Sequence, residues 1–194
     1  MNLNKTLITL TTCVITVFTN SASAHTFGAH GAGFVEGLAH PLVGLDHLLA
    51  MVAVGLWAAQ LGGRALWMTP LAFVTVLAGG AGLALCGWDL PLVETMIAAS
   101  VLVLGSMVAG SVRVSVWVSM MAVSLFALFH GYAHGLEMPQ AAMPWAYGTG
   151  FILATAMLHG LGISLGLTLS RYHGLSRIGG TAIALSGAYL LASM

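Results

Sequence analysis

Residues 40–47, HPLVGLDH, lead directly into the apolar run LLAMVAVGLWAAQ at residues 48–60. Residues 40–60 together have the length of a helix that crosses a membrane. The head of this helix nevertheless carries two imidazoles and a carboxylate, and ionisable groups cost free energy in hydrocarbon and are usually functional where they occur. The stretch therefore predicts a membrane helix with a polar site at one end, for which the rest of the chain must supply the partners.

The composition of the whole chain is that of an integral membrane protein. It is 59% hydrophobic and 5% charged, whereas a soluble domain carries about 25% charged residues. The net charge is zero with histidine neutral, which gives no electrostatic basis for a nucleic-acid partner. Membrane lipid is therefore the expected surrounding, and the composition leaves the oligomeric state open.

The first 24 residues have the pattern of a cleavable signal peptide. One lysine is followed by a short apolar core and by the small residues Ala22-Ser23-Ala24, which form an A-x-A cleavage site. Cleavage would place His25 at the start of the mature chain, outside the membrane, and would leave Cys86 without a disulfide partner. The alternatives are an uncleaved anchor, which would add a seventh span, and acylation of Cys13, which the preceding Thr12 disfavours.

Six apolar runs follow, each near the 20 residues that cross a membrane. They lie at residues 40–60, 65–87, 91–111, 114–136, 144–170 and 174–193. The expected fold is all-α, an integral membrane bundle of six transmembrane helices after a cleavable signal peptide. The expected organisation is a signal peptide at 1–24, an extracytoplasmic histidine-containing segment at 25–39 and a six-helix transmembrane domain at 40–194.

The arginines test the topology of these six spans. With the mature N-terminus outside, the loops after spans one, three and five are cytoplasmic. Those loops hold every arginine of the chain, which are Arg64, Arg113, Arg171 and Arg177. This distribution follows the positive-inside rule. It predicts a multi-pass protein of a bacterial cytoplasmic (inner) membrane with its N-terminus outside.

Histidines from two spans are expected to meet near the outer surface. With Pro41 in the first turn of span one, His47 would lie about 10 Å below His40 on nearly the same face. Span four ends in FHGYAHGLE, residues 129–137, where His130 and His134 share one face and Glu137 follows. Because spans one and four run in opposite directions, these groups are expected at similar depth.

Such a set of side chains predicts a metal site, because neutral imidazole binds borderline divalent ions such as nickel, cobalt, copper and zinc. The candidate ligands are His40, Asp46, His47, His130, His134 and Glu137. Asp46 points about 100° away from His47 on a helix, so it can orient a ligand, serve a second ligand set or pack against another span. The bland alternative for a single histidine at a membrane surface is a polar anchor.

Four further residues are candidates for the same ion. His25, His30 and Glu36 precede span one and are positioned to gather ions at the outer mouth, with a solvated tail as the alternative. His159 lies about 22 Å along span five at 1.5 Å per residue. An intramembrane histidine is a functional candidate by default, which makes it a station on a path inward. No tightly bound cofactor is expected.

The chain resembles the HupE/UreJ family over essentially its whole length. The resemblance is carried by HPLVGLDHLLAMVAVGLWAAQ, by FHGYAHGLE, and by the leader ending SASA followed by HTFGAHGAGFVEGLAHP. It implies a nickel or cobalt permease rather than an enzyme, with Ni²⁺ or Co²⁺ as the transported ion and hydrogenase or urease maturation proteins as possible partners. The resemblance decides neither the metal nor the metalloenzyme that is served.

Transport without ATP is the expected mechanism, since the chain contains no GxxxxGK[ST] phosphate-binding loop. The membrane potential acts on a divalent cation with about 4.6 kcal/mol per 100 mV. Two other interpretations stay open: a metal-binding accessory protein that does not transport, and a membrane hydrolase with a catalytic zinc.

Overall fold

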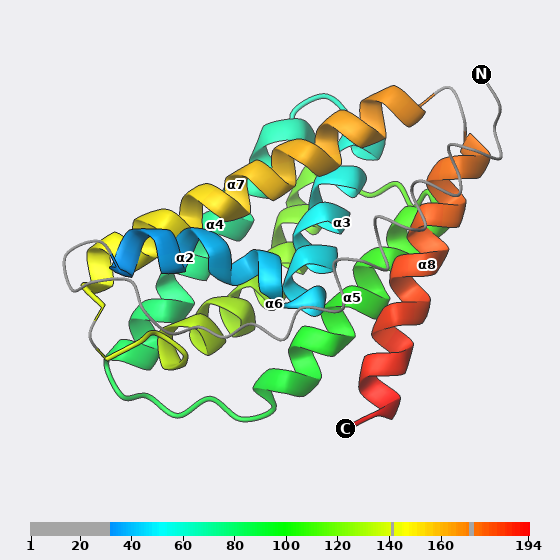
Figure 1. The fold of residues 1–194 in the computed structure, drawn as a ribbon. Helices are drawn as coiled ribbons and strands as arrows, with labels where there is room; N and C mark the ends of the chain where they lie inside the picture. The colour runs from blue at the N-terminus through cyan, green and yellow to red at the C-terminus, as the bar shows by residue number, and fades with distance from the viewer. Residues whose placement is uncertain (1–31, 141, 171–172) are drawn as a thin grey trace, which may run out of the picture.

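The computed structural model describes residues 32–140, 142–170 and 173–194, and these residues form helices and no strand (Figure 1). The helices are α2 (Ala32–Val43), α3 (Leu45–Leu61), α4 (Ala65–Leu85), α5 (Val93–Gly110), α6 (Val116–Leu136), α7 (Pro144–Leu169) and α8 (His173–Ala192). The all-α prediction is therefore confirmed for these ranges. The expected signal peptide at 1–24, together with His25 and His30, lies outside the described residues.

Five helices, α4 to α8, are long and apolar enough to cross a membrane. The pair α2 and α3 passes the same test together, although the two helices meet at an angle of 82°. The chain is thus a multi-pass membrane protein by length and composition. It reaches the expected six spans only when the bent pair is counted as one.

The structure corrects the expectation of a straight first span from residue 40. Pro41 lies inside α2, not in the first turn of a helix, and His40 is near the end of that helix. The chain then leaves helical geometry at Gly44, whose φ of −80° and ψ of 115° are extended. A Cβ at Gly44 would lie 2.9 Å from Asp46 Oδ1 and 3.0 Å from His47 Nδ1. Because Gly44 has no Cβ, the side chains of Asp46 and His47 have room directly after the bend.

Close packing in the bundle depends on glycine. A Cβ at Gly131 of α6 would overlap the carbonyl oxygen of Leu77 in α4, and a Cβ at Gly55 of α3 would overlap that of His159 in α7. A Cβ at Gly180 of α8 would overlap the backbone nitrogen of Ala109 in α5. Small residues at such contacts let backbones approach closely in lipid, where hydrophobic burial does not drive helices together.

Helix α3 is the central element of the bundle. Met51, Val54 and Trp57 on this helix are almost fully buried. The Trp57 Nε1–H also donates to the carbonyl oxygen of Val112, 2.9 Å away. Because α3 is surrounded by other helices, the polar groups at its start face neighbouring helices as well as the surface.

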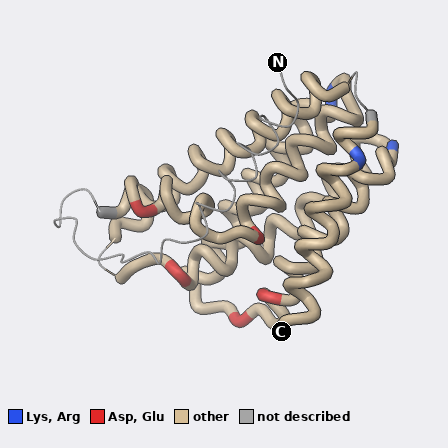
Figure 2. Tube along the Cα trace, turned by 45° about the vertical axis from the view of Figure 1, so that its right-hand side comes forward, with Lys and Arg blue, Asp and Glu red and all other residues tan. Residues whose placement is uncertain are grey.

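Charge is separated along the bundle (Figure 2). The described basic residues, Arg64, Arg113 and Arg177, lie at one end, here called the arginine end, and the acidic residues lie toward the other, the carboxylate end. Exposed tryptophans occur near both ends. Trp67 and Trp117 lie in the first turns of α4 and α6, whereas Trp88 follows the C-terminus of α4 and Trp145 lies in the first turn of α7. Tryptophan is enriched at both membrane–water interfaces, so these side chains indicate a bundle that runs from one interface to the other.

The contact between α5 and α8 gives a test of this packing. Gly180→Ala places a methyl group against the backbone of Ala109, and we expect it to lower the free energy of unfolding by about 1–3 kcal/mol, as overpacking does. Gly179→Ala is the matched control, because a Cβ there meets nothing within 4 Å. Thermal unfolding of the purified variants in detergent measures both. Equal unfolding temperatures would contradict the close approach of α8 to α5.

Candidate metal site

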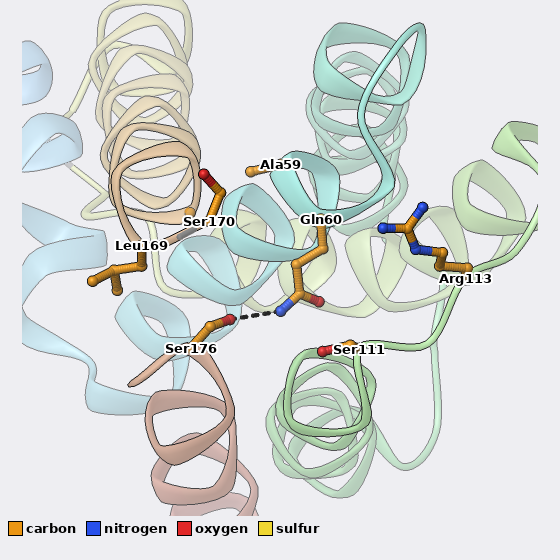
Figure 3. Close-up of a pocket in the computed structure, with 8 residues that line it drawn as sticks. Ala59, Gln60, Ser111, Arg113, Leu169, Ser170 and Ser176 are labelled. Atoms are coloured by element: carbon orange, nitrogen blue, oxygen red, sulfur yellow. Dashed lines mark hydrogen bonds between the residues drawn. The ribbon is translucent and has the colours of Figure 1, made fainter. Parts of the chain in front are cut away.

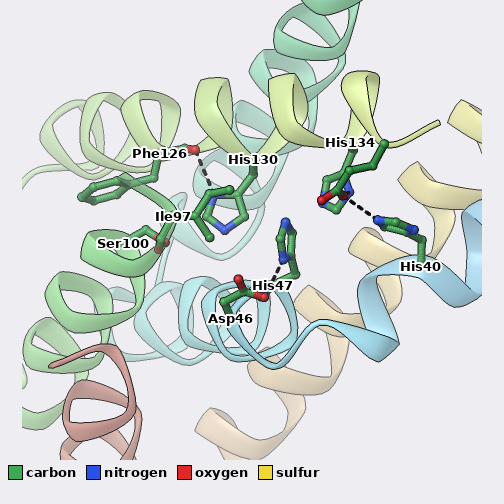
Figure 4. Close-up of polar contacts among 9 residues, drawn as sticks. His40, Asp46, His47, Ile97, Ser100, Phe126, His130 and His134 are labelled. Carbon is green, nitrogen blue, oxygen red and sulfur yellow. Dashed lines mark hydrogen bonds and ion pairs between the residues drawn. The ribbon is translucent and has the colours of Figure 1, made fainter. Parts of the chain in front are cut away.

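Four imidazoles from three helices meet toward the carboxylate end (Figure 4). His40 comes from α2, His47 from α3, and His130 and His134 from α6. The ring centroid of His134 lies 4.8 Å from that of His40 and 4.2 Å from that of His47, and the rings of His47 and His130 are 5.0 Å apart. These four residues, the histidine cluster, form a continuous row of rings.

The bend at Gly44 decides how the cluster is built. His40 and His47 were expected on one face of one helix, and this geometry is wrong, because they lie on two helices at 82° to each other. Each reaches the rings of α6 from its own helix. Helical spacing does place His130 and His134, which are four residues apart, on the same side of α6.

Several buried ring nitrogens in the cluster have no hydrogen-bond partner among the described residues. They are Nε2 of His47, Nε2 of His130 and both nitrogens of His134. All three side chains are buried, with His130 and His134 no more than 2% exposed. Buried polar groups in proteins are nearly always hydrogen-bonded, and each exception calls for an explanation such as an ion bound in function.

Neighbouring oxygens fix which ring nitrogen is free to bind. Asp46 Oδ1 lies 2.7 Å from His47 Nδ1, and the carbonyl oxygen of Phe126 lies 3.0 Å from His130 Nδ1. Since both oxygens can only accept, each Nδ1 carries the proton and each Nε2 keeps its lone pair. Metal-ligating histidines usually donate their other ring N–H in this way. Of the three roles open to Asp46, the geometry supports the orientation of His47.

A carboxylate closes the other end of the row. Glu137 caps the C-terminus of α6. Its Oε2 accepts from His40 Nε2 at 2.8 Å and lies 3.5 Å from His134 Nδ1. The imidazoles of His134 and His40 hold the pKa of the Glu137 carboxyl well below its ordinary value, so it is negatively charged at neutral pH.

The three side chains at this end can bind one ion after small movements. One ligand atom from each of His40, His134 and Glu137 lies within 4.8 Å of the other two. Nitrogen and oxygen ligands bind zinc at about 2 Å, which puts ligand atoms about 3–4 Å apart. Side-chain rotations that move the ligand atoms by about 1 Å would therefore bring this set to bonding geometry.

An acidic pocket of about 630 Å³ opens beside the cluster. Four of the chain's five acidic residues line it. Its lining is Glu36, Ala39, His40, Val43, Gly44, Asp46, His47, Glu94, Glu137, Pro139 and Tyr147. A concave site lined by one sign of charge raises the local concentration of the opposite ion, so the pocket is suited to collect cations.

Two ionisable residues of this pocket were not among the candidates from sequence. Glu94 lies in the first turn of α5, and Tyr147 is on α7. A carboxylate in an otherwise apolar span is itself an indication of function, so Glu94 could have been found from sequence. The sequence around Tyr147 gives no comparable indication of function.

His159 lies apart from the cluster. It is buried in α7, and the ring of Phe73 from α4 contacts it with centroids 5.1 Å apart. The same Phe73 ring contacts His130 at 5.8 Å. The side chain of Phe73 therefore contacts both the histidine cluster and His159.

A second pocket, of about 210 Å³, lies near the arginine end (Figure 3). Among the residues that the structure describes, its lining includes Gln60, Arg113 and Ser176 and no histidine or carboxylate. The Gln60 Nε2 donates to Ser176 Oγ at 2.7 Å and to the carbonyl oxygen of Val108 at 3.0 Å, which links α3, α8 and α5. With an arginine in its wall, this pocket is a poor cation site.

Comparison with known proteins agrees with the resemblance seen in the sequence. The family described as HupE / UreJ protein matches residues 13–190. The chain is 46% identical over 183 residues to "Protein HupE" of Rhizobium leguminosarum bv. viciae, which covers 93% of this chain and 95% of that protein. No solved structure gives a significant match.

The contact between Asp46 and His47 predicts an effect on metal affinity. Asp46→Ala removes the acceptor that holds His47 Nδ1–H, and we expect Ni²⁺ or Co²⁺ to bind about 10–100-fold more weakly, as when other partners of ligating histidines are lost. Equilibrium dialysis of the purified protein measures this affinity.

Asp89→Ala is the control for this change. It removes the same charge near the carboxylate end, but Asp89 does not line the acidic pocket. An Asp46→Ala protein that binds as tightly as the Asp89→Ala protein would contradict the role of Asp46.

Proposed function

Because the chain belongs to the HupE/UreJ family, which is associated with nickel and cobalt uptake for hydrogenase or urease, we propose that it imports Ni²⁺ or Co²⁺ across a bacterial cytoplasmic membrane. The observation that carries this proposal is the histidine cluster, with its buried ring nitrogens that no described residue pairs. Hydrogenase or urease maturation proteins would receive the ion.

The chemistry of the cluster matches these ions. Nickel and cobalt are borderline divalent ions that imidazole suits, whereas carboxylate and water suit magnesium and calcium. The row of His40, His134, His47 and His130 offers imidazoles from the edge of the acidic pocket into the bundle. An ion attracted by the carboxylates would exchange water for imidazole nitrogens as it passes from one ring to the next.

The positive-inside rule supports an orientation of the bundle with the arginine end in the cytoplasm. In this orientation the acidic pocket would face outward. Uptake then runs from the carboxylate end to the arginine end, in the direction that a negative-inside potential favours. The chain would thus act as a permease and not as an enzyme.

Uptake should require His134, whose ring lies between those of His40 and His47. Cells that express the chain should accumulate radioactive nickel at nanomolar concentration, with cobalt as a competitor. His134→Ala should reduce this uptake to the level of the empty vector, because it interrupts the row of rings. Asp89→Asn, outside the pocket lining, should leave uptake unchanged at equal expression.

Two results would count against the permease. Nickel and cobalt uptake equal to that of the empty vector, despite expression in the membrane, would contradict it. Metal binding to the purified protein without flux in vesicles would favour an accessory protein.

The driving force gives a separate prediction. A potential of 100 mV, negative inside, stabilises a divalent cation by about 4.6 kcal/mol on the inner side, which corresponds to roughly a thousandfold accumulation. Proteoliposomes with a potassium diffusion potential set by valinomycin should therefore accumulate nickel without ATP. Accumulation that stays the same after the potential is collapsed would contradict potential-driven transport.

A further inference from the structure

Helix α7 carries two buried polar side chains that the histidine cluster does not use. Thr155 is 0% exposed and His159 is 2% exposed. Neither Thr155 Oγ1 nor the two ring nitrogens of His159 have a hydrogen-bond partner among the described residues. The two residues are four apart, which puts their side chains on the same face of the helix.

Thr155 differs from the other serine and threonine residues of the same helix. Thr149, Ser164 and Thr168 each donate to the carbonyl oxygen four residues earlier, at 2.7–2.8 Å. That bond is the ordinary way for a helical hydroxyl to satisfy its hydrogen in a place without water. Those three residues are exposed on the surface of the bundle, whereas Thr155 is buried and its hydroxyl stays free.

The position of the pair fits the path from the pocket inward. Helix α7 begins near the carboxylate end, and His159 lies about 22 Å along it at 1.5 Å per residue. Phe73 contacts His159 on one side and His130 of the cluster on the other. His159 therefore lies beyond His130 of the cluster, separated from it by the ring of Phe73.

Packing alone does not account for a histidine and a threonine at this depth. Leucine and valine would fill comparable volumes without burying three polar atoms that lack partners, and such atoms carry a desolvation cost. Ionisable side chains within membrane spans mark ion and substrate pathways. An ion that has lost its water at the cluster also needs ligands in the remaining half of the bundle.

We propose that Thr155 and His159 form a second, inner station for the transported divalent cation, which supplies an imidazole nitrogen and a hydroxyl oxygen after the ion leaves the histidine cluster. This inference rests on the proposed function. Conduction through a membrane requires sites that bind strongly enough to admit an ion and weakly enough to release it. With fewer protein ligands than the cluster, the inner station is suited to release toward the arginine end.

The test separates binding from transport in the full-length protein. Wild type, His159→Leu, Thr155→Val and Thr155→Ser are purified and reconstituted, and nickel binding and potential-driven nickel uptake are measured on the same preparations. Thr149→Val is the matched control, because it removes a hydroxyl that already donates within α7. Thermal unfolding shows whether each variant is folded.

The expected result is a loss of flux without a loss of the first ion. His159→Leu should bind its first Ni²⁺ with an affinity close to that of wild type and transport it about tenfold more slowly or worse. Thr155→Val should also slow transport, whereas Thr155→Ser and Thr149→Val should transport like wild type. Wild-type rates in both His159→Leu and Thr155→Val would overturn the inner station.

Two further results keep the inference decidable. If His159→Leu does not fold, the comparison of Thr155→Val with Thr155→Ser tests the proposal. Equal transport by these two variants would overturn it. If wild type itself moves no metal, the proposed function fails, and the station is then judged by Co²⁺ bound at saturation. One ion fewer in His159→Leu than in wild type would support it, and equal numbers would overturn it.

Discussion

Imidazole nitrogens that are buried without partners are the constraint on which the rest of this structure depends. His47, His130 and His134 place such nitrogens among the helices, where an unmade hydrogen bond costs about 1–3 kcal/mol. The surrounding contacts hold them in place in spite of this cost. Asp46 and the Phe126 carbonyl fix two of the rings from behind, and glycine lets α4 and α6 approach until their backbones touch.

The bend between α2 and α3 is the part of the fold that the sequence did not predict. Apolar length was enough to predict the apolar helices α4 to α8, because it depends on composition along the chain. The break at Gly44 depends on what surrounds it. Proline at position 41 is compatible with both a helix start and a helix interior, and the space at Gly44 is filled by Asp46 and His47 only after the chain has folded.

The candidate site was predicted in its residues but not in its geometry. Two motifs 90 residues apart named the histidines, and the structure brings His40, His47, His130 and His134 into one row. The role of Asp46 could not be decided from a helical wheel, which separates it from His47 by about 100°, although its Oδ1 lies 2.7 Å from His47 Nδ1. Glu94 shows the opposite case, because its carboxylate in an apolar span was visible in the sequence and its place in the pocket was not.

The account's central claim is that the histidine cluster is the binding site of the transported ion. X-ray absorption at the nickel edge tests it most directly, on the purified full-length protein loaded with one equivalent of Ni²⁺. The account predicts nitrogen and oxygen ligands at about 2 Å, with the multiple-scattering pattern of at least two imidazoles, and loss of imidazole scattering in His134→Ala. A spectrum without imidazole scattering in the wild-type protein would contradict it.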